Sequence, residues 1–398
     1  MMGDVVGCGI DPEMEWAMLS KPIRITPMRF AVKIAPVKIA MALLLGLFAV
    51  SAQAALPLDQ LTLPKGFHIA LYSDQVANAR EIALGAKGTV FVGSGDAGKV
   101  YALTDSKGSG VADKVRVVAS GLQSPIGVAF KNGDLYVSAV RRIVVLRDIE
   151  DHLDDPPTPE VITDKLPPET HHGGKFIAFG PDGKLYVPIG APCNICDPGP
   201  DHGKLIRMSA DGSGVQDVAR GIRNSVGFAW QPGTGQLWFT DNGRDMLGDD
   251  LPSDELNRVT RVGEHFGFPY CHQGDTLDPQ FGKGKNCKDY EPPVLNLGAH
   301  VAALGMRFYE GHQFPASYRG AIIIAEHGSW NRSKKSGYRV MTVRLHGDKV
   351  VSYEPLITGF APNERAWGRP ADVQPLPDGS VLVSDDLAGA VYRLAYRP

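Results

Sequence analysis

One short pattern recurs six times along this chain: an apolar strand, a tight turn rich in Gly, Asp or Asn, and a second strand. The hairpins lie about 45 to 60 residues apart, except for a longer fourth interval of 85 residues. Such a period without helical periodicity is typical of a β-propeller with one four-stranded sheet per blade. The sequence therefore predicts an all-β fold, a six-bladed β-propeller whose four-stranded antiparallel blades surround a central channel. The copies occupy Arg80–Gly95, Ile126–Ala139, Phe176–Gly190, Val226–Asp241, Leu304–Glu326 and Ala371–Asp385.

Two further strands flank the repeats. Leu63–Ser73 precedes the first repeat, and Ala388–Tyr396 follows the last one. A propeller must protect the strand edges where its first and last blades meet. We therefore expect the N-terminal strand to pair into the C-terminal blade, and residues 55–398 to form a single domain.

The first 54 residues have a different character. Lys33 and Lys38 precede the apolar run Ile39–Val50, which is followed by Ala52–Ala54 and then by polar chain. This order is typical of a secretory signal peptide, and the run is short for a membrane span. Residues 1–54 are thus predicted to be a cleaved leader of a periplasmic or secreted protein. The stretch before Met28 contains acidic residues, which are unusual in a signal peptide. We therefore expect the true start codon to lie further downstream than Met1.

Composition excludes several classes of partner. The formal net charge is −3 and no basic stripe is present, which argues against nucleic acid; no second apolar segment suggests a membrane span. Four cysteines remain after the leader, an even number that favours disulfides in an exported protein. We predict the pairs Cys193–Cys196 and Cys271–Cys287, with a four-thiolate zinc site as the alternative.

Two clusters precede repeated strands, where the mouth of the channel is expected. His171 and His172 lie in Thr170–Lys175, and a histidine of near-neutral pKa there could serve as a general base. Arg223 and Asn224 could grip carbonyl or carboxylate oxygens. The alternatives are a pair of solvent-facing histidines and an arginine that ties neighbouring blades together.

Two more clusters flank the later blades. The acidic loop Thr240–Asn257 has the oxygen-rich character of a hard-cation site, or else is a solvated loop that begins the long insertion of the fourth interval. His327–Arg332 and Trp367–Pro370 combine Trp faces with Arg forks. A Trp in a strand-rich protein, however, is more often a core residue than a cofactor platform.

Together these clusters resemble the soluble quinoprotein glucose/sorbosone dehydrogenase family over about Leu63 to Tyr396. The motifs Gly-Ile-Arg-Asn-Ser, Asp-Asn-Gly-Arg-Asp with Asp-Glu-Leu-Asn, and His-Gly-Ser-Trp-Asn-Arg are most similar to its sorbosone-dehydrogenase-like branch. The resemblance implies a six-bladed propeller that holds pyrroloquinoline quinone (PQQ) over the channel, with Ca²⁺ beneath the quinone.

The resemblance also implies roles for individual residues. An ungapped count matches His172 to the family's base, whereas a one-residue gap would select His171. Arg223 and Asn224 match the pair that contacts the quinone carbonyls, and Arg369 matches an arginine that binds a cofactor carboxylate. The remaining expected cofactor contacts are Asn242, where the family usually has Gln, and His327, Trp330, Asn331, Arg332 and Trp367. The expected calcium site comprises Gly243 and Arg244, through backbone carbonyls, and Asp254 and Glu255.

The chain departs from the family pattern at three points. Ala371 stands where the family often has Arg, and Ala191 stands where an Asp often helps to orient the base. A cofactor-binding Lys has no clear match, and His327 and Arg332 are the nearest candidates. These departures bear on cofactor affinity and substrate identity more than on the reaction.

The implied reaction is oxidation of a sugar at C1. The base takes the C1 hydroxyl proton while hydride moves to the quinone, and Arg223 and Ca²⁺ stabilise the developing charge. The product is a lactone or an acid, and the electrons pass to a periplasmic cytochrome, a quinone or a dye. Two alternatives from other classes are a calcium-dependent lactonase and a non-catalytic sugar-binding propeller.

Overall fold

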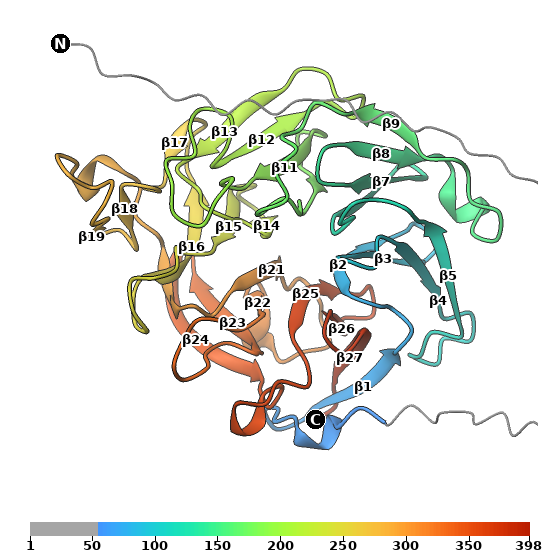
Figure 1. Ribbon diagram of the computed structural model, residues 1–398. Coiled ribbons are helices and arrows are strands. Elements are labelled where there is room, and N and C mark those ends of the chain that lie inside the picture. The colour runs from blue at the N-terminus through green and yellow to red at the C-terminus, as the bar shows by residue number, and fades with distance from the viewer. Residues whose placement is uncertain (1–54) are drawn as a thin grey trace, which may run out of the picture. The chain divides into compact units, whose positions relative to one another are not determined.

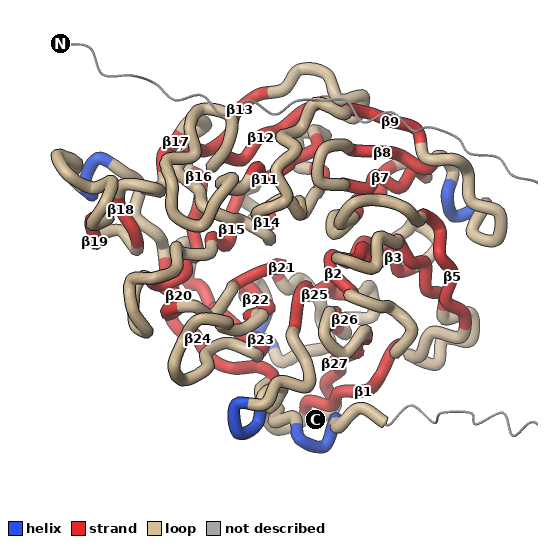
Figure 2. Tube along the Cα trace, viewed as in Figure 1, coloured by secondary structure: helices blue, strands red, loops and turns tan. Residues whose placement is uncertain are grey.

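The computed structural model describes residues 55–398, and the predicted leader lies outside the described residues. Figure 1 shows six antiparallel blades in a ring around a channel, which confirms the predicted six-bladed propeller. Strands and loops make up nearly all of this part of the chain (Figure 2), and none of its helices is long and apolar enough to cross a membrane. The helices are short 3₁₀ segments: η1 (Leu58–Gln60), η2 (Ile149–Asp151), η3 (Cys287–Asp289), η4 (Ala316–Tyr318) and η5 (Pro362–Glu364).

Each blade contains four consecutive strands, except where stated below. Blade 1 is β2 (Ala79–Leu84), β3 (Val90–Ser94), β4 (Val100–Thr104) and β5 (Lys114–Ala119). Blade 2 is β6 (Val128–Lys131), β7 (Asp134–Ser138), β8 (Ile143–Leu146) and β9 (Glu160–Thr163). Blade 3 is β10 (Ala178–Phe179), β11 (Leu185–Ile189), β12 (Lys204–Met208) and β13 (Gln216–Arg220). Blade 4 is β14 (Gly227–Trp230), β15 (Leu237–Asp241), β16 (Ser253–Val259) and β20 (Leu295–Ala299). Blade 5 is β21 (Ala303–Phe308), β22 (Ile322–Glu326), β23 (Arg339–His346) and β24 (Lys349–Ile357).

The ring closes in blade 6, as predicted. This blade is built from β25 (Pro370–Pro375), β26 (Val381–Asp385), β27 (Ala390–Tyr396) and the N-terminal strand β1 (Phe67–Ser73). β1 runs antiparallel to β27 from the Phe67–Tyr396 pair onward, and the two lie side by side in Figure 1. The last strand of the chain is therefore not an open edge.

The long fourth interval forms an insertion outside the ring. After β16 the chain adds β17 (Glu264–His265) to blade 3, parallel to β13, and then forms the hairpin of β18 (Cys271–His272) and β19 (Thr276–Leu277), which projects from the ring in Figure 1. The disulfide Cys271–Cys287 braces this insertion, and Cys193–Cys196 closes a short loop after β11. Both predicted disulfides are thus confirmed, and these sulfurs are not zinc ligands.

Stacking of the blades explains why the second strand of each repeat is mostly apolar. Every residue of β3, β11, β15, β22 and β26 is buried, because a neighbouring blade covers each face of its sheet. An apolar cluster fills each space between neighbouring blades; Phe91 of blade 1, for example, packs with Val137 of blade 2. Each fully buried side chain of this size contributes about 1.5 to 3 kcal/mol.

In every second blade, a hydroxyl group near the channel forms a hydrogen bond to the next blade. Ser138, Thr240 and Ser384 occupy equivalent positions in the second strands of blades 2, 4 and 6. Their oxygens donate to the carbonyls of Lys175, Leu304 and Arg80 in the next blade at 2.5, 2.8 and 2.6 Å. A small polar residue at this point of the repeat therefore satisfies an inner-strand carbonyl that has no strand partner.

A buried charged cluster joins five blades across the channel. Glu81 of blade 1 accepts hydrogen bonds from the backbone N–H groups of Val128 and Ile177, in blades 2 and 3, both at 3.0 Å. Asp372 of blade 6 accepts from Ile82 N–H at 2.9 Å. Arg307 of blade 5 lies between the carboxylates, 3.3 Å from Asp372 and 3.8 Å from Glu81.

Burial raises the pKa of both Glu81 and Asp372, and the charge of Arg307 opposes that rise. The three side chains are therefore interdependent. Gly305 permits the close approach of Asp372, because a Cβ at that position would overlap the Asp372 side chain. The core of the ring thus depends on one arginine and the two carboxylates that face it.

We expect Arg307→Met to destabilise the protein by about 3 to 5 kcal/mol, because it leaves two buried carboxylates without their cation. The loss should be smaller at pH 5 than at pH 8, since carboxyl groups deprived of a cation bind protons more readily. Urea unfolding at both pH values measures the change.

Lys114→Met is the matched control. It removes an exposed ion pair with Asp154 and should cost less than about 1 kcal/mol at either pH. Equal losses in the two variants would show that the channel cluster does not hold the blades.

Candidate active site at the mouth of the channel

Two adjoining cavities lie where the inner strands begin and the second strands end. The main cavity has a volume of 290 Å³ and the side cavity 280 Å³, and both are lined by Arg80, His172, Asn224 and Val226. An apolar cluster of Ile126, Val226, Leu304 and Ala371 packs across the channel between opposite blades. Loops from several blades therefore converge on one polar hollow above an apolar floor, as expected for a propeller site.

The structure distinguishes the two candidate histidines. His172 is partly buried and lines both cavities, whereas His171 is exposed and lines neither. The Nδ1 atom of His172 lies 2.9 Å from the carbonyl oxygen of Ala191. Because a carbonyl only accepts, Nδ1 carries the proton and Nε2 keeps its lone pair. Burial and the nearby Arg223 charge lower the pKa of His172 to about 3, so the ring is neutral at physiological pH.

The contact at Ala191 resolves one of the family departures. The Ala191 side chain cannot hold the His172 ring, but the main-chain carbonyl of the same residue accepts a hydrogen bond from its Nδ1. The Ala191 N–H in turn donates to the carbonyl oxygen of Arg223 at 2.8 Å. One short backbone segment after β11 therefore contacts both His172 and Arg223.

Arg223 is buried with its guanidinium at the wall of the main cavity. Its Nη1 donates to the carbonyl of Asn242 at 3.1 Å, and its Nε and Nη2 donate to Asn194 at 3.1 and 2.8 Å. The backbone N–H groups of Arg223 and Asn224 both donate to the Asp241 carboxylate. Arg223 thus ties blades 3 and 4 together and also presents its charge to the cavity. A structural role between blades and a ligand-binding role, which the sequence offered as alternatives, are therefore compatible.

The two asparagines at this wall have different roles. Asn224 lines both cavities. The side chain of Asn242 donates to the carbonyls of Asn224 and Ala303 at 3.0 and 2.9 Å, so it links blade 4 to blade 5. Asn242 lines the main cavity while fixing the backbone around it.

Part of the expected cation site also faces the main cavity. Gly243 and Asp254 line it, and the Asp254 carboxylate accepts from the N–H groups of Gly243 at 2.8 Å and Ala302 at 2.6 Å. Burial raises the pKa of Asp254 to about 7. A cation bound there would lower that pKa, because it favours the carboxylate.

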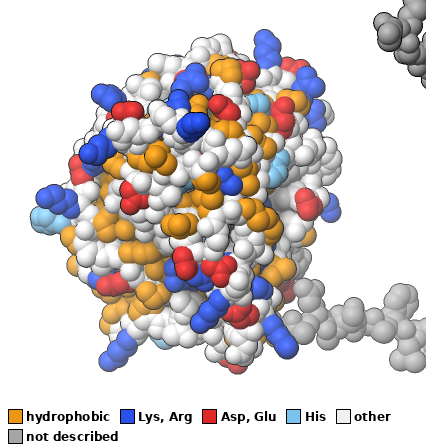
Figure 3. Space-filling view, turned by 60° about the vertical axis from the view of Figure 1, so that its left-hand side comes forward, with side chains coloured by type: hydrophobic (Ala, Val, Ile, Leu, Met, Phe, Trp, Pro, Cys, Tyr) orange, Lys and Arg blue, Asp and Glu red, His pale blue; other side chains and the backbone are white. Residues whose placement is uncertain are grey.

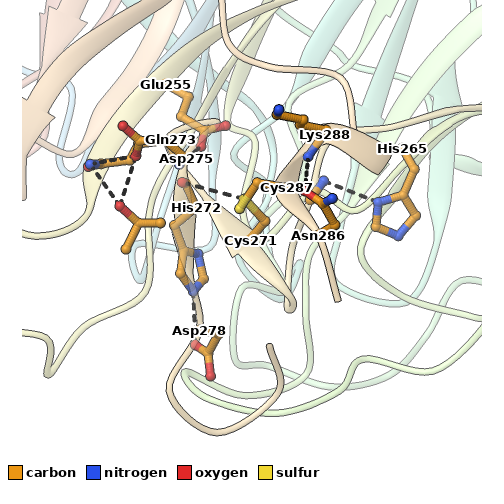
Figure 4. The surroundings of a disulfide bond; sticks show 12 residues. Glu255, His265, Cys271, His272, Gln273, Asp275, Asp278, Asn286, Cys287 and Lys288 are labelled. Carbon is orange, nitrogen blue, oxygen red and sulfur yellow. Dashed lines mark hydrogen bonds and ion pairs between the residues drawn. A yellow bond between two sulfur atoms is a disulfide. The ribbon is translucent and has the colours of Figure 1, made fainter. Parts of the chain in front are cut away.

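Two other residues predicted for the cation site do not line the main cavity. The Arg244 guanidinium pairs with Asp278 of the insertion at 2.6 Å, so any part of Arg244 in the cation site remains that of its backbone carbonyl, as predicted from the sequence. Glu255 follows Asp254 on β16, and successive side chains on a strand face opposite ways. Its carboxylate accepts from the Gln273 N–H at 2.7 Å, among the insertion residues shown in Figure 4. Glu255 therefore braces the insertion and does not line the cavity.

Blades 5 and 6 supply the opposite wall. His327, Trp330, Asn331 and Arg369 all line the main cavity. The guanidinium of Arg369 donates to the carbonyl of His327 at 3.2 Å, and His327 Nε2 lies 2.8 Å from the Asp386 carboxylate. Trp330 is 69% exposed, so its ring is free to cover a ligand.

Two expected cofactor contacts lie away from the cavity. Arg332 donates to the carbonyl of Asp249 at 2.9 Å and pairs with Asp250, which fixes the neighbouring loop. Trp367 donates to the carbonyl of Gly359 and packs on Phe360, in the core between blades 5 and 6. The ordinary role of Trp in a core explains Trp367.

Sequence reasoning missed three residues of the site. Arg80 lines both cavities, Asp386 lines the side cavity, and His300 lines the main one. Arg80 and Asp386 form an ion pair at 2.8 Å. Arg80 could have been found from the repeats, because it occupies the same inner-strand position as Ile126 and Val226.

The face of the molecule drawn in Figure 3 shows no patch of a single sign of charge. On the face drawn in Figure 3, basic and acidic side chains are interspersed. This agrees with the near-balance of charges in the whole sequence.

Comparison with known sequences places these observations in a family. The family described as Glucose / Sorbosone dehydrogenase matches residues 136–393. An uncharacterized protein of Borreliella burgdorferi is 33% identical over 84% of this chain and 91% of its own length. Aldose sugar dehydrogenase YliI of Escherichia coli is 27% identical over 58% of this chain and 62% of its own length.

Two solved structures share the fold at low sequence identity. A calcium structure of a Trichoderma reesei carbohydrate-active enzyme of family AA12 has a TM-score of 0.75 and 19% identity, and covers 85% of this chain and 97% of its own. The holo form of the pyranose dehydrogenase PQQ domain from Coprinopsis cinerea has a TM-score of 0.71 and 17% identity, and covers 84% and 97%. Because the family model matches residues 136–393, more than half of the sequence, the chain belongs to the glucose/sorbosone dehydrogenase family of sugar oxidoreductases.

Proposed function

We propose that this protein is an exported quinoprotein that oxidises an aldose or a sugar aldehyde at C1, with PQQ as cofactor and Ca²⁺ as its metal. The family supports a sugar dehydrogenase, and one structural neighbour is described as a holo PQQ domain and another as a calcium structure. Two disulfides favour an oxidising compartment. The electrons would leave to a cytochrome, a quinone or a dye.

One observation carries the proposal: His172 and Arg223 face the same cavity and are joined through the backbone of Ala191. His172 offers an unprotonated Nε2, and Arg223 offers a fixed positive charge. A base and a fixed cation at one hollow suit a reaction that removes a proton while negative charge develops nearby.

The cavity residues fit an anionic, carbonyl-rich cofactor. Arg223 and Arg369 provide charged donors on opposite walls. Asn331 adds a buried side-chain oxygen that has no hydrogen-bond partner within residues 55–398 and could accept from an N–H or O–H group of a ligand. Oxygens of Gly243 and Asp254 would hold the calcium ion, whose usual ligands are carbonyls and carboxylates.

When bound, PQQ supplies the electrophilic carbonyl that accepts a hydride. His172 Nε2 removes the proton of the C1 hydroxyl, and the C1–O bond becomes the carbonyl of the lactone as hydride leaves C1. The Ala191 carbonyl holds the imidazole in the required tautomer. The apolar floor of Ile126, Val226 and Leu304 limits water at the bottom of the site.

The lactonase alternative is less well supported. A hydrolase of that kind would need side-chain carboxylates arranged around its metal. Among the described residues only two carboxylates, Asp245 and Asp254, line the main cavity, and Asp245 lies 3.5 Å from the guanidinium of Arg223. The arginine-rich walls instead favour an anionic cofactor.

We expect dye-linked oxidation of aldoses only when the purified protein is supplied with both PQQ and Ca²⁺. Neither component alone should restore activity after chelation and exhaustive dialysis, since the metal and the arginines neutralise the cofactor together. Full turnover without PQQ would refute the proposed chemistry.

His172→Ala should lower kcat by roughly two to four orders of magnitude, the usual contribution of a general base. Cofactor binding should remain, because the arginines and the cation site are unchanged. The matched control is His171→Ala, whose exposed ring lines neither cavity and whose loss should be at least tenfold smaller. Stopped-flow reduction of bound quinone compares the variants, and a larger loss for His171→Ala would reassign the base.

We expect the imidazole of His172 to stay neutral down to low pH in the protein without cofactor. NMR titration should give a pKa far below the usual 6.5, because burial and Arg223 both disfavour the cation. Arg223→Met removes a neighbouring positive charge and should move this pKa upward. Since a base acts unprotonated, activity should be lost as pH falls through the His172 pKa. A normal pKa in the wild-type protein would contradict the buried geometry.

A further inference from the structure

The disulfide-closed loop Cys193–Cys196 takes no part in the chemistry proposed above. Its disulfide closes a loop of four residues between β11 and β12. Asn194 lies inside that closed loop, and does not line either cavity. Its contacts nevertheless converge on Arg223.

Asn194 contributes two of the hydrogen bonds that hold the Arg223 guanidinium. Its backbone carbonyl accepts from Nε at 3.1 Å, and its side-chain Oδ1 accepts from Nη2 at 2.8 Å. The same Oδ1 accepts from the N–H of Asp245 at 3.1 Å, and the Asp245 carboxylate lies 3.5 Å from Nη2. Asn194 therefore joins the arginine to the chain that follows Gly243.

Two acceptors from one residue fix both the position and the plane of a guanidinium. They can do so only if the residue itself is fixed. A backbone loop closed three residues apart by a covalent bond has few alternative conformations. The disulfide thus restricts the group that in turn restricts Arg223.

The same segment also reaches the proposed base. Ala191, just before the loop, accepts from His172 Nδ1 and donates to the carbonyl of Arg223. Asp197, the residue directly after the loop, accepts from the Tyr270 hydroxyl of the insertion at 3.2 Å. This hydrogen bond does not involve Arg223.

We propose that Asn194, presented by the disulfide-closed loop Cys193–Cys196, is a positioning residue that orients Arg223 towards the cofactor cavity. The functional part of this proposal rests on the proposed PQQ chemistry, whereas its structural part does not. Asn194 acts through Arg223, and the disulfide acts through Asn194.

The first experiment uses the protein without cofactor. Arginine side chains are labelled with ¹⁵N, and the Arg223 Nε–H signal is assigned by its absence in Arg223→Lys. In the Cys193→Ser/Cys196→Ser double variant we expect this hydrogen to exchange with solvent at least tenfold faster, since its acceptor is no longer fixed. Unchanged exchange in the folded double variant would overturn the structural part.

The second experiment measures PQQ binding in the presence of Ca²⁺ by quenching of tryptophan fluorescence. Asn194→Ala should weaken binding roughly tenfold or more, the usual effect of losing a hydrogen bond to a charged group. Asn194→Asp keeps an oxygen acceptor and should restore most of the affinity. Asp197→Ala, a matched control directly after the loop, should bind as the wild type does.

The outcomes separate the two proposals. If the wild-type protein does not bind PQQ but the double variant still exchanges faster, the proposed function fails and the positioning of Arg223 stands. If the wild-type protein binds PQQ and Asn194→Ala binds equally well, the positioning role fails and the proposed function stands. The Asn194 variants also guard against misfolding of the double variant, because they keep the disulfide.

Discussion

The structure depends on the way that its inner strands are held together across the channel. An inner strand has a sheet partner on one side only, so its other backbone groups must find partners in neighbouring blades. The carboxylates Glu81 and Asp372 supply acceptors, and Arg307 compensates their charge. The hydroxyls of Ser138, Thr240 and Ser384 supply donors at equivalent points of alternate blades.

This closure of the channel is also what makes a site possible at one mouth. The apolar side chains of Ile126, Val226, Leu304 and Ala371 pack together across the channel and form the floor of the site. The loops at that mouth therefore surround a hollow and not an open pore. The loops are then fixed to one another: Asn242 bonds to Asn224 and Ala303, and Ala191 bonds to His172 and Arg223. Under the proposed function, groups held in this way need little reorganisation during the reaction.

The sequence predicted the architecture well because the signal was repeated. Six hairpins of similar form set the number of blades, and the edge that a ring must close set the place of β1. The disulfide pairs followed from export and from short spacing. The spacing of the repeats predicts the long insertion, but no sequence pattern predicts the short parallel pairing of β17 with β13.

The site was predicted less completely, for identifiable reasons. A motif gives residues in order but not the faces that they occupy, so Glu255 was grouped with Asp254 although alternation along β16 separates them. Arg332 and Trp367 share the chemistry of cofactor contacts but are used in loop bracing and in the core. Conversely, Ala191 was counted as a loss because a side chain was missing, and its carbonyl performs the contact.

The central claim is that the cavity at His172 and Arg223 supports oxidation of a sugar by a bound quinone. Its most direct test is to load the protein with PQQ and Ca²⁺, exclude oxygen and dye, and add an aldose while recording the absorbance of the quinone. We predict loss of the oxidised-quinone absorption with formation of an equal amount of lactone. Tight binding of the cofactor with no absorbance change on addition of any aldose or sugar aldehyde would contradict the account.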